Sequence, residues 1–240
     1  MLNKLIIPRN WRQKVFLFGM IANLQFVILS LIAMVFYRGG FSYLTDPLCA
    51  LGFTHVAGES NIISCLIFNT SMFLVGVSVI FLFSTLLSFF SDDPIEKFFS
   101  SAGTIFAIFS GIAMCGVALT PADINFEAHV IFVPFTFFFV LFMVSFYIIP
   151  LVKNTRFPNR YSYVLLMYSV FLVITLILFY MGYGGYTQER SIIQIITQKT
   201  AIYIEVFVLF ALSFGAWKLE RTLQEFILPC SSVKRNYLVF

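Results

Sequence analysis

A few acidic, amide and imidazole side chains stand out in this chain of 240 residues, because 60% of its residues are hydrophobic and only 11% are charged. Glu205 lies inside a long apolar stretch, where an ionised carboxylate needs a cation, hydrogen-bond donors or water. An acid there is a candidate functional residue by default. We expect His129 to be its partner, since Lys199 faces elsewhere on the helix. The other candidates lie in or near the connections between apolar stretches: Asp46, Glu59, Asn69 and Asp123.

Together these six side chains predict a polar, mostly acidic cap over an apolar bundle. Such a cap is suited to engaging a lipid headgroup or a lipid-linked ligand, with Asn69 orienting the site. Two histidines, His55 and His129, together with the carboxylates could hold a divalent cation. No pair has the i, i+4 spacing of a helical metal motif, so we predict neither a metal nor another cofactor.

Two other functions stay open. One is an integral-membrane enzyme that acts on lipid, with His129 or Glu205 as general base and with or without a metal. The other is a small transporter or channel in which Glu205 relays a proton or a cation. No serine lies in a recognisable nucleophile elbow, and no apolar stretch has the central break of a transporter helix. A non-catalytic ligand-binding protein is therefore our first hypothesis.

Six apolar stretches must position these side chains. A helix crosses the hydrocarbon core of a bilayer in about 20 residues, and lipid cannot hydrogen-bond an exposed backbone amide. The sequence therefore predicts an all-α membrane protein, a bundle of six transmembrane helices that forms one integral membrane domain over residues 1–240. The expected spans are 15–37, 62–90, 99–119, 130–151, 161–182 and 200–217.

The distribution of basic residues predicts the orientation. If six spans alternate, twelve of the 15 Lys and Arg residues fall on the side of the termini and three on the other side. Basic residues are enriched in cytoplasmic segments, so both termini are expected to be cytoplasmic. The net charge of +4 then reflects topology, and no basic block with interleaved aromatics favours nucleic acid. Compact connections and the absence of a transit peptide favour the inner membrane of a bacterium.

One helix face is expected to make close contacts. Gly103, Ala107 and Gly111 recur every four residues in the third apolar stretch, and such small residues let helix backbones approach closely. A second copy of the chain or another membrane protein could pack on this face. Membrane lipids are the other expected partners.

Two local features complete the expectations. Ser91 or Asp92 is expected to cap the third helix, just before a proline that fits an early helical position. Cys49 and Cys65 both fall on the predicted outer side, where they could form a disulfide or stay reduced.

The order of the outer-side features resembles two related groups of six-span membrane proteins. Residues 46–52 (Asp-Pro-Leu-Cys-Ala-Leu-Gly), 59–61 (Glu-Ser-Asn) and 67–69 (Ile-Phe-Asn) carry the resemblance. They are similar to the first-loop signatures of the prokaryotic family called domain of unknown function 998 (DUF 998) and of the eukaryotic DRAM/Sfk-type group. Ala50 stands where the first family has a serine, and Gly58 where the second has a proline.

Two further stretches extend this resemblance over residues 42–217. Residues 120–123 (Thr-Pro-Ala-Asp), followed by His129, are similar to the connection between helices three and four in both groups. Residues 200–201, followed by Glu205, resemble the start of the sixth helix of the DRAM/Sfk-type group. The resemblance implies six helices with both termini in the cytosol. It implies little about chemistry, because the prokaryotic family has no assigned activity.

Overall fold

Six long α-helices dominate the structure, a computed structural model that describes residues 9–182 and 192–235. Each helix is long and apolar enough to cross a membrane, which confirms the predicted all-α bundle. The helices are α1 (Arg9–Phe36), α2 (Ile62–Leu86), α3 (Pro94–Leu119), α4 (Phe126–Lys153), α5 (Arg160–Gly182) and α6 (Ile192–Arg235).

Several helices extend beyond the predicted spans. α6 differs most, since it runs for 44 residues whereas the apolar stretch covers only 200–217. α3 begins at Pro94 rather than at residue 99. A helix continues past its hydrocarbon-length apolar run when its ends become amphipathic, so apolar length alone underestimates helix length.

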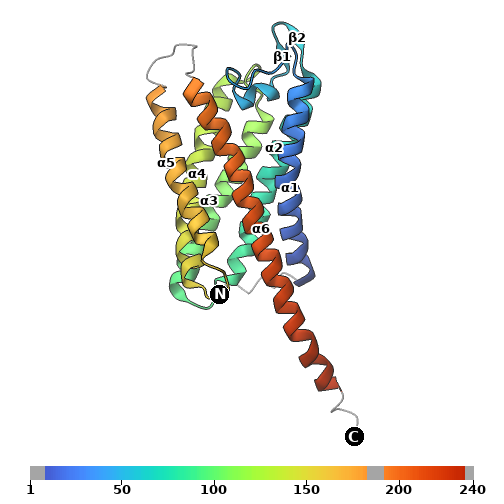
Figure 1. The fold of residues 1–240 in the computed structure, drawn as a ribbon, viewed down its shortest axis with the longest axis vertical. Coiled ribbons are helices and arrows are strands. Elements are labelled where there is room, and N and C mark those ends of the chain that lie inside the picture. The colour runs from blue at the N-terminus through green and yellow to red at the C-terminus, as the bar shows by residue number, and fades with distance from the viewer. Residues whose placement is uncertain (1–8, 183–191, 236–240) are drawn as a thin grey trace.

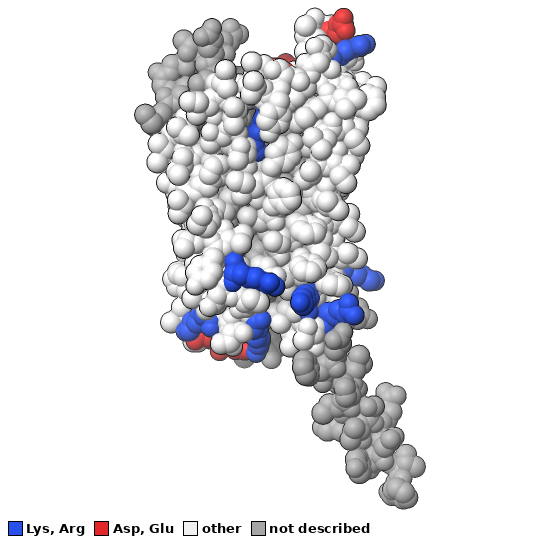
Figure 2. All heavy atoms as spheres, viewed as in Figure 1, with Lys and Arg blue, Asp and Glu red and all other residues white. Residues whose placement is uncertain are grey.

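The helices form a closed ring in chain order, in which α6 returns to pack against α1 (Figure 1). α1 begins and α6 ends at one end of the bundle, which we call the terminal end. Basic side chains gather at this end, whereas most of the surface above it in Figure 2 is uncharged. The opposite end, which we call the loop end, carries the connection between α1 and α2.

This connection covers the loop end of the bundle. It contains the short 3-10 helix η1 (Leu48–Gly52) and an antiparallel hairpin of β1 (His55–Val56) and β2 (Glu59–Ser60). Leu48 and Leu51 of η1 are fully buried, and η1 contacts α1, α2 and α6. Because η1 closes the bundle from this side, we call it the roof.

Asp93, rather than the expected Ser91 or Asp92, caps α3. Its Oδ1 accepts hydrogen bonds from two backbone N–H groups of the first turn, at 2.8 and 3.0 Å. The earlier positions were wrong because the capping residue directly precedes the first helical residue, Pro94. Lys153 Nζ donates to Asp93 Oδ2 at 2.7 Å, and this bond together with the backbone bonds lowers the pKa of Asp93.

The small-residue face of α3 packs inside the chain. A Cβ on Gly111 would come within 2.6 Å of the carbonyl oxygen of Gly76 in α2. A Cβ on Gly103 would come within 2.6 Å of the Tyr147 ring in α4, and Ala107 is fully buried. The face that could have received a partner is thus covered by α2 and α4 of the same chain.

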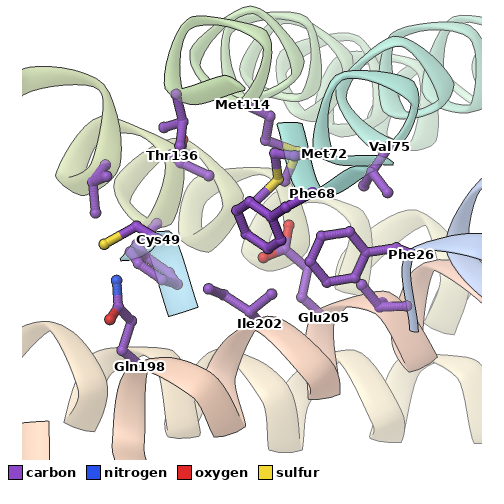
Figure 3. A pocket seen from close by; sticks show the side chains of 14 residues that line it. Phe26, Cys49, Phe68, Met72, Val75, Met114, Thr136, Gln198, Ile202 and Glu205 are labelled. Carbon is purple, nitrogen blue, oxygen red and sulfur yellow. The ribbon is translucent and has the colours of Figure 1, made fainter. Parts of the chain in front are cut away.

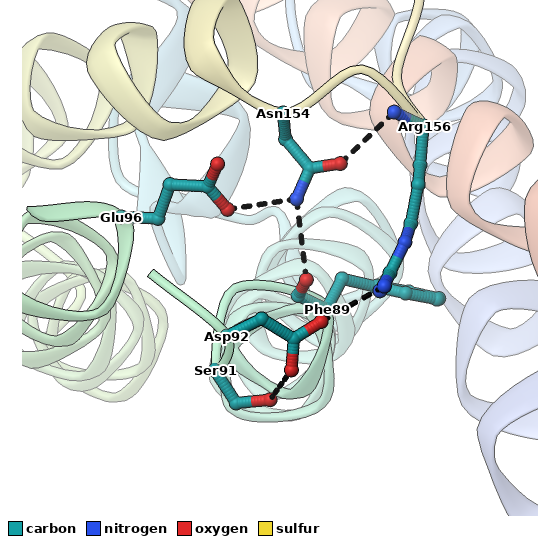
Figure 4. Close-up of polar contacts among 6 residues, drawn as sticks. All are labelled: Phe89, Ser91, Asp92, Glu96, Asn154 and Arg156. Carbon is teal, nitrogen blue, oxygen red and sulfur yellow. Dashed lines mark hydrogen bonds and ion pairs between the residues drawn. The ribbon is translucent and has the colours of Figure 1, made fainter. Parts of the chain in front are cut away.

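A polar network, buried at Asn154 and Glu96 and exposed at Asp92 and Arg156, joins α3 to the end of α4 at the terminal end (Figure 4). Asn154 Nδ2 donates to Glu96 Oε2 at 2.8 Å and to the carbonyl oxygen of Phe89 at 3.3 Å. Asn154 Oδ1 accepts from the backbone N–H of Arg156 at 3.0 Å, and the Arg156 guanidinium pairs with Asp92 at 2.8 Å. Glu96 is buried, so Asn154 supplies the donor that its carboxyl group needs.

Candidate functional site

A cavity lies inside the ring between α1, α2, α3, α4 and α6, next to the roof. About 580 Å³ in and around it is free of atoms when space open to the outside is included, and about 40 Å³ of this can hold the centre of a water molecule. Figure 3 shows its side chains converging from these helices. The wall is mostly apolar and includes Phe26, Phe68, Met72, Val75, Met114 and Phe137.

Glu205 brings an acidic group into this apolar cavity. It projects from α6, is only 3% exposed, and its carboxyl group reaches towards the rings of Phe26 and Phe68 (Figure 3). The hydroxyl of Tyr168 in α5 donates to Glu205 Oε2 at 3.3 Å. The other oxygen, Oε1, is buried and has no hydrogen-bond partner within residues 9–182 and 192–235. The cavity is therefore lined by a carboxyl group that retains unused hydrogen-bonding capacity.

Three further polar side chains line the cavity: Cys49, Thr136 and Gln198. Gln198 and Glu205 are seven residues apart in α6, with Ile202 between them, so all three lie on one helix face. The hydroxyl of Thr136 donates to the backbone of its own helix at 3.0 Å. Polar groups thus occupy a few places in a wall that is otherwise hydrocarbon and sulfur.

Asn69 of α2 holds the roof in place. Its Nδ2 donates to the carbonyl oxygen of Gly52 at 3.1 Å, and the thiol of Cys65 donates to the same oxygen at 3.2 Å. A Cβ on Gly52 would collide with Asn69 Oδ1, so only glycine fits here while Asn69 keeps this position. Cys49 and Cys65 carry separate thiols, and the disulfide that the sequence left open is not present.

Lys199 of α6 fastens the connection that leads to the roof. Its side chain is fully buried, and Nζ donates to the carbonyl oxygen of Tyr43. Nζ also lies 4.8 Å from the ring centroid of Phe41 and 4.4 Å from that of Tyr43. Asp46 lies near enough to interact with Lys199 electrostatically, and its Oδ2 accepts from the backbone N–H of Ser42 at 2.7 Å. Lys199 and Asp46 therefore act on the connection before the roof.

Asp123 ties the connection between α3 and α4 to the hairpin. Its Oδ2 accepts hydrogen bonds from Thr54 Oγ1 at 2.6 Å, from Thr54 N–H at 2.8 Å and from His55 N–H at 3.0 Å. Partial burial is the largest single influence on this carboxyl group and raises its pKa. The hydrogen bonds from Thr54 and His55 together outweigh burial, so the pKa of Asp123 lies below its usual value.

Glu59 and His129 make separate contacts at the loop end. Glu59 Oε2 lies 3.3 Å from Arg38 Nε, and both side chains are well exposed. His129 is buried, and its Nδ1 donates to the carbonyl oxygen of Thr120 at 2.7 Å. This bond joins the start of α4 to the end of α3.

Of the six predicted site residues, Glu205 lines the cavity, and the other five lie on or beside the loop-end connections. Asp46, Asn69 and Asp123 each bind a segment of the connection between α1 and α2. In the described part of the chain, no group of three or more His, Cys, Asp or Glu side chains is placed to hold a metal ion.

The sequence analysis missed two polar neighbours of this site, Gln198 and Tyr168. The spacing of Gln198 and Glu205 on one helix face was a readable signal. Tyr168 gave none, because its position in α5 does not reveal which neighbouring helix its hydroxyl faces.

No family model, no curated protein and no solved structure matches this chain. The resemblance to DUF 998 and to the DRAM/Sfk-type group stays a prediction. The functional argument therefore depends on the cavity and on the side chains that line it.

Proposed function

We propose that this membrane protein binds an amphiphilic molecule of the bilayer in the cavity. The apolar part of the molecule lies among the phenylalanine and methionine side chains, and its polar group bonds to Glu205. The observation that carries this proposal is Glu205 Oε1, a buried oxygen without a hydrogen-bond partner in the described structure, on a side chain that lines a mostly apolar cavity.

Two physical arguments support an amphiphilic ligand. A buried polar atom without a partner costs about 1–3 kcal/mol, and a donor on the ligand would recover much of this. Small-molecule sites typically have mostly apolar walls and a few polar groups that fix the orientation of the ligand. The cavity has this character, with Glu205 and Gln198 as orienting groups on one face of α6. A lipid or lipid-linked molecule belongs to this chemical class.

Three of the other predicted site residues, Asp46, Asn69 and Asp123, position the roof or its flanking segments in this proposal. Asn69 holds η1 on α2, Lys199 with Asp46 holds the preceding segment on α6, and Asp123 holds the hairpin that follows. These contacts keep the loop end of the cavity closed. They act on the ligand through the roof and not by direct contact.

We also propose that the terminal end faces the cytoplasm and that the membrane is the inner membrane of a bacterium. The excess of Lys and Arg in the segments at the terminal end supports this orientation. Labelling of single cysteines with a membrane-impermeant reagent in intact cells tests it. Cysteines placed at exposed Arg38 and Lys153 should label from opposite sides of the membrane.

A cavity-filling substitution tests the binding proposal. Val133 lines the cavity from α4, and Val133→Phe adds a ring to this space. Val170→Phe is the matched control, because Val170 is an exposed residue of the membrane-spanning helix α5. Native mass spectrometry of the purified proteins should show a co-purified amphiphile on the wild type and on Val170→Phe, and little on Val133→Phe. If all three proteins retained the amphiphile equally, the cavity would not be its binding site.

A further inference from the structure

We infer that the polar group of the ligand is an organic cation, an amine or quaternary ammonium carried on an apolar body. This inference rests on the proposed function of the cavity and goes further by naming the charge of the ligand. It combines three observations: the single carboxyl group among the lining residues, the aromatic rings beside it, and the arrangement of the nearest lysine.

The first observation is that the cavity has an acid and no base. Among its lining residues, all of them in the described part of the chain, Glu205 is the carboxylic acid, and there is no lysine, arginine or histidine. An ionised carboxylate enclosed by hydrocarbon is strongly disfavoured unless a cation or several donors compensate it. Tyr168 supplies one donor, to Oε2 at 3.3 Å, which leaves Oε1 for a second.

The second observation is the aromatic surroundings of this carboxyl group. Phe26 and Phe68 line the same cavity as Glu205, with their ring centroids 5.9 Å apart and their planes tilted by 54°. Phe137 adds a third ring to the wall. The faces of aromatic rings attract ammonium groups, and this attraction grows when the cation is desolvated. A carboxylate in a cavity lined by phenylalanine rings therefore offers both charge and ring contacts to a cation.

The third observation concerns Lys199, whose positive charge would otherwise oppose a cationic ligand. Its ammonium group is held by the carbonyl oxygen of Tyr43 and lies over the rings of Phe41 and Tyr43. Its acidic neighbour is Asp46, in the connection before the roof. Lys199 is thus paired outside the cavity, and Glu205 stays available to a ligand.

The test compares amphiphiles that share one tail and differ in charge. The full chain is purified in an uncharged maltoside detergent and titrated with decyltrimethylammonium, decanol or decanoate, with thermal unfolding as the readout. We expect the ammonium compound to bind the wild type about tenfold more tightly than decanol, as a charge-assisted contact implies. Glu205→Gln should remove this preference, because the amide keeps the shape and loses the charge. Val133→Phe, with its cavity filled, serves as the control for effects of each compound on the detergent micelle.

The outcomes separate the two proposals. If decanol binds the wild type as tightly as the ammonium compound, or if Glu205→Gln keeps the preference, the cationic ligand is overturned and a neutral amphiphile remains. If no compound acts differently on the wild type and on Val133→Phe, the cavity itself is not a binding site. Should Glu205→Gln fail to fold, Phe68→Leu replaces it. This variant keeps the carboxyl group, and it should weaken ammonium binding about fivefold while leaving decanol binding unchanged.

Discussion

Substitutions at Gly52 and Asn69 test whether the roof is held as the structure indicates. In Gly52→Ala, the new Cβ would lie 3.2 Å from Asn69 Cγ and 3.3 Å from Nδ2, and it would collide with Oδ1. Either η1 moves away from α2, or the Asn69 side chain turns and loses its bond to the Gly52 carbonyl oxygen. Overpacking of this kind costs about 1–3 kcal/mol.

The second substitution, Asn69→Ala, removes the hydrogen bond and the obstacle together. The carbonyl oxygen of Gly52 keeps the Cys65 thiol as a donor, so we expect a loss of only about 1 kcal/mol. In the double variant the added methyl group no longer meets Asn69, and the total cost should approach that of Asn69→Ala alone. The two substitutions should therefore be coupled by about 1–3 kcal/mol.

Thermal unfolding of the four proteins in one detergent measures this coupling. For a chain of this size, 1 kcal/mol shifts the melting temperature by about 2–4 °C, so Gly52→Ala should melt about 2–12 °C lower than the wild type. Ser42→Ala is the control, because this exposed side chain precedes the roof in the same connection. Additive effects of Gly52→Ala and Asn69→Ala would refute the reasoning, since they would show that the two side chains do not meet.

Two further predictions concern the ends of the bundle. The hydrogen bonds to Asp123 lower its pKa below the unfolded value of about 3.9, so their stabilisation is fully present above that value and is lost as the pH falls through the folded pKa. After correction for intrinsic exchange rates, the hairpin amides should be less protected from hydrogen exchange at pH 3 than at neutral pH. Asp123→Asn should abolish this difference. If the variant kept the same loss of protection, the assignment to Asp123 would be contradicted. At the terminal end, Asn154→Ala should lower the free energy of unfolding by about 1–3 kcal/mol, because the buried Glu96 loses its donor. In the double variant Asn154→Ala, Glu96→Leu, part of the lost unfolding free energy should return in the same thermal assay. If none returns, the loss in Asn154→Ala does not come from its bond to Glu96.

Apolar length predicted the number and type of the helices because a membrane span leaves a strong signal in composition. It did not predict where α6 begins and ends, since residues 192–199 mix four isoleucines with polar residues and charged residues follow position 217, yet both segments continue the helix. The cap of α3 was predicted one or two residues too early, since Asp93 is the residue that caps the helix. Ser, Asp and Pro cluster there, and only the backbone decides which side chain precedes the first turn.

The candidate site was less predictable than the fold. Glu205 stood out because an acid is rare in an apolar stretch, whereas its surroundings depend on how six helices are rotated about their axes. Phe26 and Phe68 belong to a chain with 32 phenylalanines, and nothing local separates these two from the rings that face lipid. Lys199 looked like an isolated charge because its partner is the backbone of Tyr43, and backbone partners leave no mark on a sequence.

The length of α6 links the cavity to the opposite end of the molecule. Glu205 lines the cavity, and the same helix continues to Arg235, beyond the terminal end of the bundle (Figure 1). At 1.5 Å per residue, the last turn is about 45 Å from Glu205, so a tilt of about 5° around the cavity would move it by about 4 Å. A small change in the tilt of α6 at the cavity would therefore appear as a larger displacement of the helix end outside the bundle.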